Sequence, residues 1–288
     1  MHDVAIKRAD PHAASVVYKR HSLAVRLLHW INALTLTILL MSGLMIFNAH
    51  PSLDWGKQSY SGKPPLFSIE ARSGPDDQPV GITTLFGREF NTTGVLGVSA
   101  GRDGQATESP FPSWLTIPRY YSLAEARLWH FFFAWLLIVN GALYVLNGWR
   151  SRHFRHDLWP TGQDWRGIGG SILDHIRFRH PQGEDARHYN VLQKISYLGV
   201  IFVLLPLIVL AGWAMSPWLN SLAPGWVDLL GGRQAARTIH FLVAWLLVAF
   251  VAIHVFEVII SGLWNHLRSM ITGNYRISAP TKKSETGR

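Results

Sequence analysis

Two histidines, His240 and His254, lie fourteen residues apart in one segment, and every side chain between them is apolar. A neutral imidazole nitrogen can bind a metal ion, and the ring can exchange a proton near physiological pH. On an α-helix, fourteen steps of about 100° bring the second ring within roughly 40° of the first and about 21 Å farther along the axis. One helix face would therefore present two imidazoles at two depths.

Four segments are long and apolar enough to hold such groups inside a membrane. With histidine taken as neutral, the charge-free runs are 27–53, 128–149, 195–227 and 238–256. Each contains close to the about 20 apolar residues that cross the hydrocarbon core of a bilayer as a helix. These runs lack the alternation of barrel strands, and a helix satisfies its own backbone hydrogen bonds in lipid. The sequence predicts an all-α fold, an integral membrane four-helix bundle.

One transmembrane domain is expected over residues 23–273. Its spans are predicted near 24–47, 126–148, 190–216 and 235–262, between a polar tail at 1–22 and another at 274–288. Pro206 should kink the third span because it removes a backbone donor.

The long connection at 48–125 follows the first span. It is rich in Gly, Pro, Ser and Thr, a composition that favours turns and short hairpins over helix. Its aromatic residues, including Trp55 and Phe67, argue against full disorder. Two interpretations stay open: a plain surface loop, and a docking platform for a partner protein.

The distribution of basic residues indicates the topology. Lys and Arg concentrate before the first span, in the 149–188 loop and after the last span, whereas the 217–237 loop holds only Arg233 and Arg237. Positive residues in short loops stay on the cytoplasmic side. Both termini are therefore expected in the cytoplasm, with loop 48–125 outside. The net charge of +9 is explained by this topology, so nucleic acid is not an expected partner.

Depth counting along the spans predicts two histidine pairs. His29 lies three residues into its charge-free run, and His254 lies three residues before Glu257, where the last span returns to the same side. His130 and His240 each lie three residues into runs that begin on the opposite side. We therefore expect His29 to face His254 and His130 to face His240.

Two imidazoles at equal depth in a helix bundle suit the axial positions of a haem iron. Two pairs imply two haem b groups, with His29, His130, His240 and His254 as ligands, and Ala244, Leu247 and Val251 on the face between them. A single histidine at a span end is more often an interfacial or hydrogen-bonded residue, and structural zinc needs further ligands. The chain has no cysteine, which excludes iron–sulfur clusters, thioether-linked haem and disulfides. The remaining histidines are interpreted as solvated.

Three motifs resemble those of a known family. RLLHW in the first span, LWHFFFAW in the second and the two histidines of the last span resemble the prokaryotic cytochrome b561 and nickel–iron hydrogenase cytochrome b subunit family, over about residues 18–275. This family is related to the gamma subunit of formate dehydrogenase. The resemblance implies a four-span, two-haem cytochrome b in the bacterial inner membrane. It also implies the same four histidine ligands and electron transfer between a periplasmic oxidoreductase subunit and quinone in a respiratory chain. Loop 48–125 is longer than in small superoxide-oxidising members, which favours a molybdopterin-dependent or hydrogenase-type partner.

Secondary sites are expected near each surface. Haem propionates are anionic, so Arg26 on the inner side and Arg237 or Arg233 on the outer side are candidate partners, or else ordinary interfacial anchors. A quinone site near the inner pair needs polar groups. Glu257, Asn190, Gln193 and Lys194 are candidates for it, although polar residues are also usual at helix ends.

The leading hypothesis is thus an electron-transfer subunit rather than an independent enzyme. Two alternatives stay open at this point. One is a self-contained enzyme that oxidises superoxide or another small reductant and reduces quinone. The other is a haem-free membrane protein whose histidines bind metal ions or relay protons.

Overall fold

The computed structural model describes residues 15–58, 62–74, 77–101, 104–176, 190–223 and 225–278. The outer parts of both predicted tails therefore lie outside the described residues. The chain divides into two compact units. The terminal unit comprises residues 1–30, 142–203 and 248–288, and the loop unit comprises 31–141 and 204–247.

Four long apolar helical segments fit a membrane helical bundle. They are α1 (Leu23–Asn48), α2 (Leu123–Arg150), the segment Val191–Ala214, and α9 (Arg233–Ile260). Many of their large apolar side chains are exposed in the protein alone, for example Leu128 at 71% and Ile253 at 63%. Exposed apolar surface of this extent is typical of contact with lipid or a partner. The chain is mostly helical, as predicted.

The third long segment is irregular in its middle. Helix α5 (Val191–Gly199) passes into a π-helical turn, η5 (Val200–Leu204), before α6 (Leu205–Ala214). Pro206 lies at the start of α6, where its missing N–H and its ring disturb the α-helical hydrogen bonds of the preceding turn. The predicted disturbance at Pro206 thus takes the form of a widened turn.

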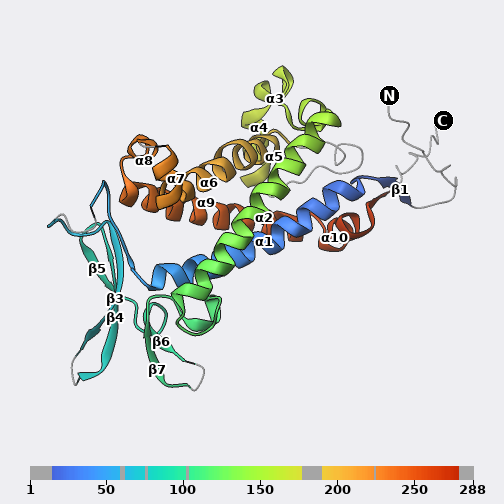
Figure 1. The fold of residues 1–288 in the computed structure, drawn as a ribbon. Coiled ribbons are helices and arrows are strands. Elements are labelled where there is room, and N and C mark those ends of the chain that lie inside the picture. The colour runs from blue at the N-terminus through green and yellow to red at the C-terminus, as the bar shows by residue number, and fades with distance from the viewer. Residues whose placement is uncertain are drawn as a thin grey trace, which may run out of the picture. The chain divides into compact units, whose positions relative to one another are not determined.

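In the terminal unit, the two ends of the described chain form a two-stranded ribbon. Strand β1 (Ser15–Lys19) pairs antiparallel with β8 (Asn274–Ser278), with Tyr18 opposite Tyr275. Helix α10 (Leu263–Thr272) leads into β8 through Gly273, whose φ of +85° suits glycine at a helix end. Figure 1 shows β1 and α10 beside the first turns of α1.

The same unit contains the connection after α2. It holds a π-helical turn η3 (Phe154–Leu158), then α3 (Gly162–Arg166) and α4 (Ile168–Ile176). Thr161 and Asp164 form a reciprocal capping box at the start of α3.

The loop unit contains β-structure, so the all-α prediction was incomplete. Strands β2 (Ser52–Leu53), β3 (Phe67–Ser73), β4 (Pro79–Leu85) and β5 (Arg88–Asn91) form an antiparallel sheet in that order. Strands β6 (Gly97–Ala100) and β7 (Ala106–Ser109) form a separate hairpin. Short helical elements η2 (Ser113–Leu115), α7 (Pro217–Leu222) and α8 (Trp226–Leu229) complete the unit.

Backbone conformation explains how these hairpins form and pack. Phe86 and Gly87 connect β4 to β5, and their φ angles of 48° and 77° are both positive, as a tight two-residue hairpin turn requires. A Cβ added to Gly81 would lie 2.0 Å from the carbonyl oxygen of Leu96, so only glycine permits this approach of the β6 hairpin to the sheet.

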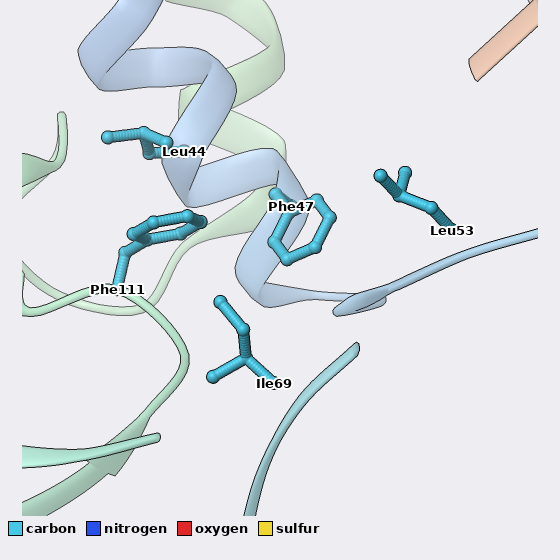
Figure 2. Close-up of a cluster of buried hydrophobic side chains, with 5 residues drawn as sticks. All are labelled: Leu44, Phe47, Leu53, Ile69 and Phe111. Carbon is cyan, nitrogen blue, oxygen red and sulfur yellow. The ribbon is translucent and has the colours of Figure 1, made fainter. Parts of the chain in front are cut away.

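A buried apolar cluster fastens the sheet to the end of α1. Figure 2 shows its members converging from the helix and from the segment that follows it: Leu44, Phe47, Leu53, Ile69 and Phe111. Phe241 of α9 stacks near Phe47, with ring centroids 4.9 Å apart. Asn48 makes two hydrogen bonds to the backbone of Phe111. Its Oδ1 accepts from the N–H at 2.8 Å, and its Nδ2 donates to the carbonyl at 3.1 Å.

The segment after α1 also caps the start of α9. The carbonyl of Gly56 accepts hydrogen bonds from the backbone N–H groups of Gln234 and Ala235, each at 3.1 Å. The hydroxyl of Thr238 donates to the Asp54 carbonyl at 2.7 Å. These bonds satisfy N–H groups that a helix N-terminus leaves without partners, and they fix the end of α9 that carries His240.

Candidate functional site

The loop unit brings His130 and His240 together. His130 lies near the start of α2 and His240 lies near the start of α9, and their ring centroids are 6.1 Å apart with an interplanar angle of 60°. The protein holds both rings by their Nδ1 atoms. Ser42 Oγ lies 3.1 Å from Nδ1 of His130, and the carbonyl oxygen of Ile208 lies 2.8 Å from Nδ1 of His240.

The contact with a carbonyl oxygen fixes the tautomer of His240. A carbonyl oxygen only accepts, so His240 must carry its proton on Nδ1. His130 fits the same tautomer, because Ser42 Oγ can accept from its Nδ1 at 3.1 Å while the hydroxyl proton goes to the carbonyl of Ile38 at 2.7 Å. In each neutral ring Nε2 is then left with a free lone pair, the form that binds a metal ion.

Two glycines allow these rings to lie close to neighbouring helices. A Cβ added to Gly43 of α1 would lie 3.4 Å from Cε1 of His130. A Cβ added to Gly212 of α6 would lie 3.3 Å from Cε1 of His240. Sequence reasoning did not identify Ser42, Gly43, Ile208 or Gly212 as part of the site. The available signal was Ser42–Gly43, two small residues at the depth of His130.

The terminal unit brings His29 and His254 together. His29 of α1 and His254 of α9 have ring centroids 6.3 Å apart and an interplanar angle of 57°. Phe250, one turn earlier on α9, stacks on His254 with an interplanar angle of 14°. The Nδ1 atom of His29 is buried and has no hydrogen-bond partner within the described part of the chain.

The separation of the rings is a test of what each pair can hold. A metal–imidazole bond is about 2 Å long and the ring centroid lies roughly 1 Å behind the nitrogen, so one metal ion held between two imidazoles would allow centroid separations up to roughly 6 Å. Both observed separations, 6.1 Å and 6.3 Å, match this value. Within the described ranges no group of three or more His, Cys, Asp or Glu side chains is placed to hold a metal ion. The donor set therefore fits an iron whose other four ligands come from a porphyrin, and does not fit structural zinc.

The two predicted arginines have different surroundings. Arg26 donates from one terminal nitrogen to the carbonyl of Ile271, while its Nε is buried without a partner in the described chain. Arg237 donates to the carbonyl of His50, and its guanidinium lies 5.9 Å from the centroid of the Phe47 ring. Arg233 is exposed.

A carboxylate accompanies Arg237. Burial and then the charge of Arg237 lower the pKa of His50, and the charge of Asp54 offsets part of this shift. Both charged groups therefore act on the same imidazole. Asp54 itself is only 8% exposed. The positive charge of Arg237 is therefore partly balanced within the loop unit.

Two histidines that the sequence analysis interpreted as solvated are partly buried. Burial, followed by the charge of Arg20, lowers the pKa of His21 to about 4. The same two causes in the same order lower the pKa of His266 to about 4. Tyr275 connects the group, because the Arg20 guanidinium lies 4.6 Å from its ring centroid and the His266 ring packs against its edge at 5.3 Å.

The polar residues considered for a quinone site are mostly used elsewhere. Asn190 caps α5 and forms a reciprocal capping box with Gln193. Lys194 pairs with Asp164 at 2.8 Å. Helix-end polarity therefore accounts for these three residues, and Glu257 is left as a partly buried carboxyl group on α9.

Four long apolar helices that carry two pairs of neighbouring histidines fit a membrane helical bundle with room for a metal-containing cofactor at each pair. Comparison with known proteins gives the family: the model of prokaryotic cytochrome b561 matches residues 20–273. The chain belongs to this family, and is a multi-pass membrane protein of electron transport for which the family implies haem b.

One curated relative is a protein of Azospira oryzae named as a candidate protein-methionine-sulfoxide reductase subunit, YedZ1. It is 38% identical over 133 residues, which cover 46% of this chain and 64% of the relative. The chain thus spans somewhat less than two thirds of that relative's length. No solved structure matches the chain.

Proposed function

We propose that this protein is the membrane subunit of an oxidoreductase complex, a di-haem cytochrome b that carries electrons between a periplasmic partner and the quinone pool. The observation that carries the proposal is the pair of facing imidazole couples, with ring centroids 6.1 Å and 6.3 Å apart. Haem b, when bound, supplies one-electron chemistry that side chains lack.

The chain's own residues bind and orient the cofactors. His130 with His240, and His29 with His254, offer Nε2 atoms to two irons. Ser42 and the Ile208 carbonyl hold two of these rings in place. Arg26 is the partner for a propionate at the His29/His254 pair, since its buried Nε has no partner in the described chain and a buried N–H group without an acceptor is costly. Arg237 has the same role at the other pair, although it also fastens the segment after α1.

The positive-inside rule orients the complex. Both termini and the 149–188 loop are cytoplasmic, and loop 48–125 is periplasmic. The His130/His240 pair is then the outer site and the His29/His254 pair is the inner site. The ordered sheet β2–β5 and the β6–β7 hairpin stand on the outer side, where they are available as a docking platform for the partner.

The partner is an oxidoreductase of the molybdopterin-dependent or hydrogenase type. The name of the Azospira relative, a reductase subunit, supports membership of such a complex. Quinone exchanges electrons near the inner pair, where Glu257 is the nearest candidate for a proton-exchanging group on α9.

The test is the haem content of the purified, haem-supplied protein by pyridine haemochrome analysis. We expect two haem b per chain, and loss of neither in His50→Ala, a control that removes an imidazole outside the pairs. A folded wild-type protein without haem rejects the proposal in favour of metal binding or proton relay. Rapid reduction of the isolated protein by superoxide, without any other subunit, favours the self-contained enzyme instead.

A further inference from the structure

The four imidazoles differ in what their Nδ1 atoms contact. In the His130/His240 pair both have acceptors, Ser42 Oγ at 3.1 Å and the Ile208 carbonyl at 2.8 Å. In the His29/His254 pair, Nδ1 of His29 is buried without a partner among the described residues. His254 has the Phe250 ring stacked on it, an apolar contact. In the His130/His240 pair, both Nδ1 atoms therefore have a hydrogen-bond partner, whereas in the other pair Nδ1 of His29 has none among the described residues.

This difference changes the basicity of the ligands. An acceptor at Nδ1–H draws the proton away from the ring and raises the electron density that Nε2 offers to a metal. A more basic axial ligand stabilises oxidised iron over reduced iron, so hydrogen bonding at Nδ1 lowers the reduction potential of the haem. The hydrogen-bond contacts alone therefore predict a lower potential at the His130/His240 pair.

Charge acts in the same direction. A nearby cation favours the reduced iron, which carries one positive charge less, and raises the potential. Arg26 of the terminal unit makes no ion pair with a carboxylate in the described chain, and Arg20 lies close to His21 and His266 in that unit. Arg237 of the loop unit is accompanied by the buried carboxyl group of Asp54. Of the two arginines proposed beside the histidine pairs, Arg26 in the terminal unit is thus the one with no neighbouring carboxylate among the described residues.

We propose that Ser42 and the Ile208 carbonyl are positioning groups that set the potential at the His130/His240 pair below the potential at the His29/His254 pair. The inference rests on the proposed function, because it takes two haems at these pairs as given. One electron leaves the first site and one electron arrives at the second, with no bond broken and no proton moved. The downhill direction is then from the outer pair to the inner pair.

The order of the two reduction potentials predicts the class of partner protein. A periplasmic enzyme that oxidises its substrate delivers electrons in the downhill direction, towards quinone. A periplasmic reductase needs electrons to move in the opposite direction, from the site of higher reduction potential to the site of lower potential. The potential gap therefore favours a partner of the dehydrogenase or hydrogenase class, which differs from the reductase named for the Azospira relative.

The experiment is a spectroscopic redox titration of the purified two-haem protein and its variants. His130→Ala identifies which midpoint belongs to the outer pair, because that midpoint disappears. Ser42→Ala removes the hydroxyl beside Nδ1 of His130 and leaves the Leu39 backbone as a partner of the ring. We expect the lower midpoint to rise by about 30 mV, a threefold change in the one-electron equilibrium. Thr37→Ala is the matched control, since it removes a hydroxyl of the same helix that donates to the Ala33 carbonyl, its partner among the described residues. It should move neither midpoint.

A second variant acts on the other ligand and keeps the test decisive if Ser42→Ala does not fold. Gly212→Ala places a methyl group 3.4 Å from Nδ1 of His240, which displaces the ring from the Ile208 carbonyl. The lower midpoint should rise again. The inference is overturned if the outer midpoint is the higher one, or if neither variant moves it. A wild-type protein with fewer than two haems instead contradicts the proposed function itself.

Discussion

Nδ1 of His130 and Nδ1 of His240 are both held by the protein, while the two rings face each other with centroids 6.1 Å apart. If each pair holds one haem, both imidazoles contribute to its binding, and loss of either one weakens that binding without changing the other pair. We therefore expect His130→Ala and His240→Ala each to remove one haem and to spare the other. The measurement is haem content with low-temperature difference spectra. Retention of both haems in both variants would contradict the pairing.

The second pair makes an independent prediction about equivalence. His29 and His254 come from different helices, yet their rings lie 6.3 Å apart. His29→Ala and His254→Ala should therefore remove the same spectral component, the one that His130→Ala retains. His153→Ala serves as the control for loss of an imidazole in the terminal unit. Different components lost from the two variants would show that the four imidazoles are combined in another way.

The two histidine pairs could be predicted from the position of each histidine along its span, because a helix has a fixed rise and a fixed turn per residue. Apolar segments of membrane-spanning length fix where each helix enters and leaves, so residues three positions from a charged boundary share a depth. The structure brings together the same rings that this counting brought together. Their role as haem ligands stays a prediction.

Other parts of the site depend on contacts that sequence spacing does not encode. A serine in a helix usually bonds to a carbonyl of its own preceding turn, as Ser42 does, and only the tertiary placement of α2 adds His130 as a second partner. The burial of His21 and His266 depends on pairing of β1 with β8, strands from opposite ends of the chain. The β4–β5 hairpin lacks the usual Asn-Gly signal, because Phe86 occupies the first left-handed position of its turn.

Attachment of the sheet to α1 depends on Ile69, which is completely buried in the apolar cluster with Leu44 and Phe47. Ile69→Ala should lower the free energy of opening of this region by about 2 to 5 kcal/mol, from lost apolar contact and the remaining cavity. Amide hydrogen exchange in β3 and β4 measures this change. Val95→Ala, at a side chain 67% exposed, should leave exchange within about 0.5 kcal/mol of wild type. Equal exchange rates in the two variants would show that the cluster does not hold the sheet.

Arg26 gives a prediction that separates charge from packing. Arg26→Gln removes the positive charge and retains a polar side chain, so the midpoint potential of the His29/His254 haem should fall, and the other midpoint should stay constant. The sign follows because a cation favours the reduced iron. Lys19→Gln, at an exposed residue of β1, is the charge-matched control and should have a much smaller effect because water screens it. A larger shift in the control than in Arg26→Gln would remove Arg26 from the site.

The terminal unit should lose stability in mild acid. The pKa of His266 in the folded protein is about 4, below the ordinary histidine value of 6.5, because burial and then Arg20 disfavour the charged ring. Between these two values the unfolded chain binds a proton that the folded chain does not, so the free energy of unfolding is full above about pH 6.5 and decreases as the pH falls towards 4. His21 acts with the same sign. Hydrogen exchange of β1 and β8 should therefore accelerate between pH 7 and pH 5, after correction for intrinsic rates. His266→Gln should reduce this dependence, and an unchanged pH profile in that variant would show that the acid sensitivity has another origin.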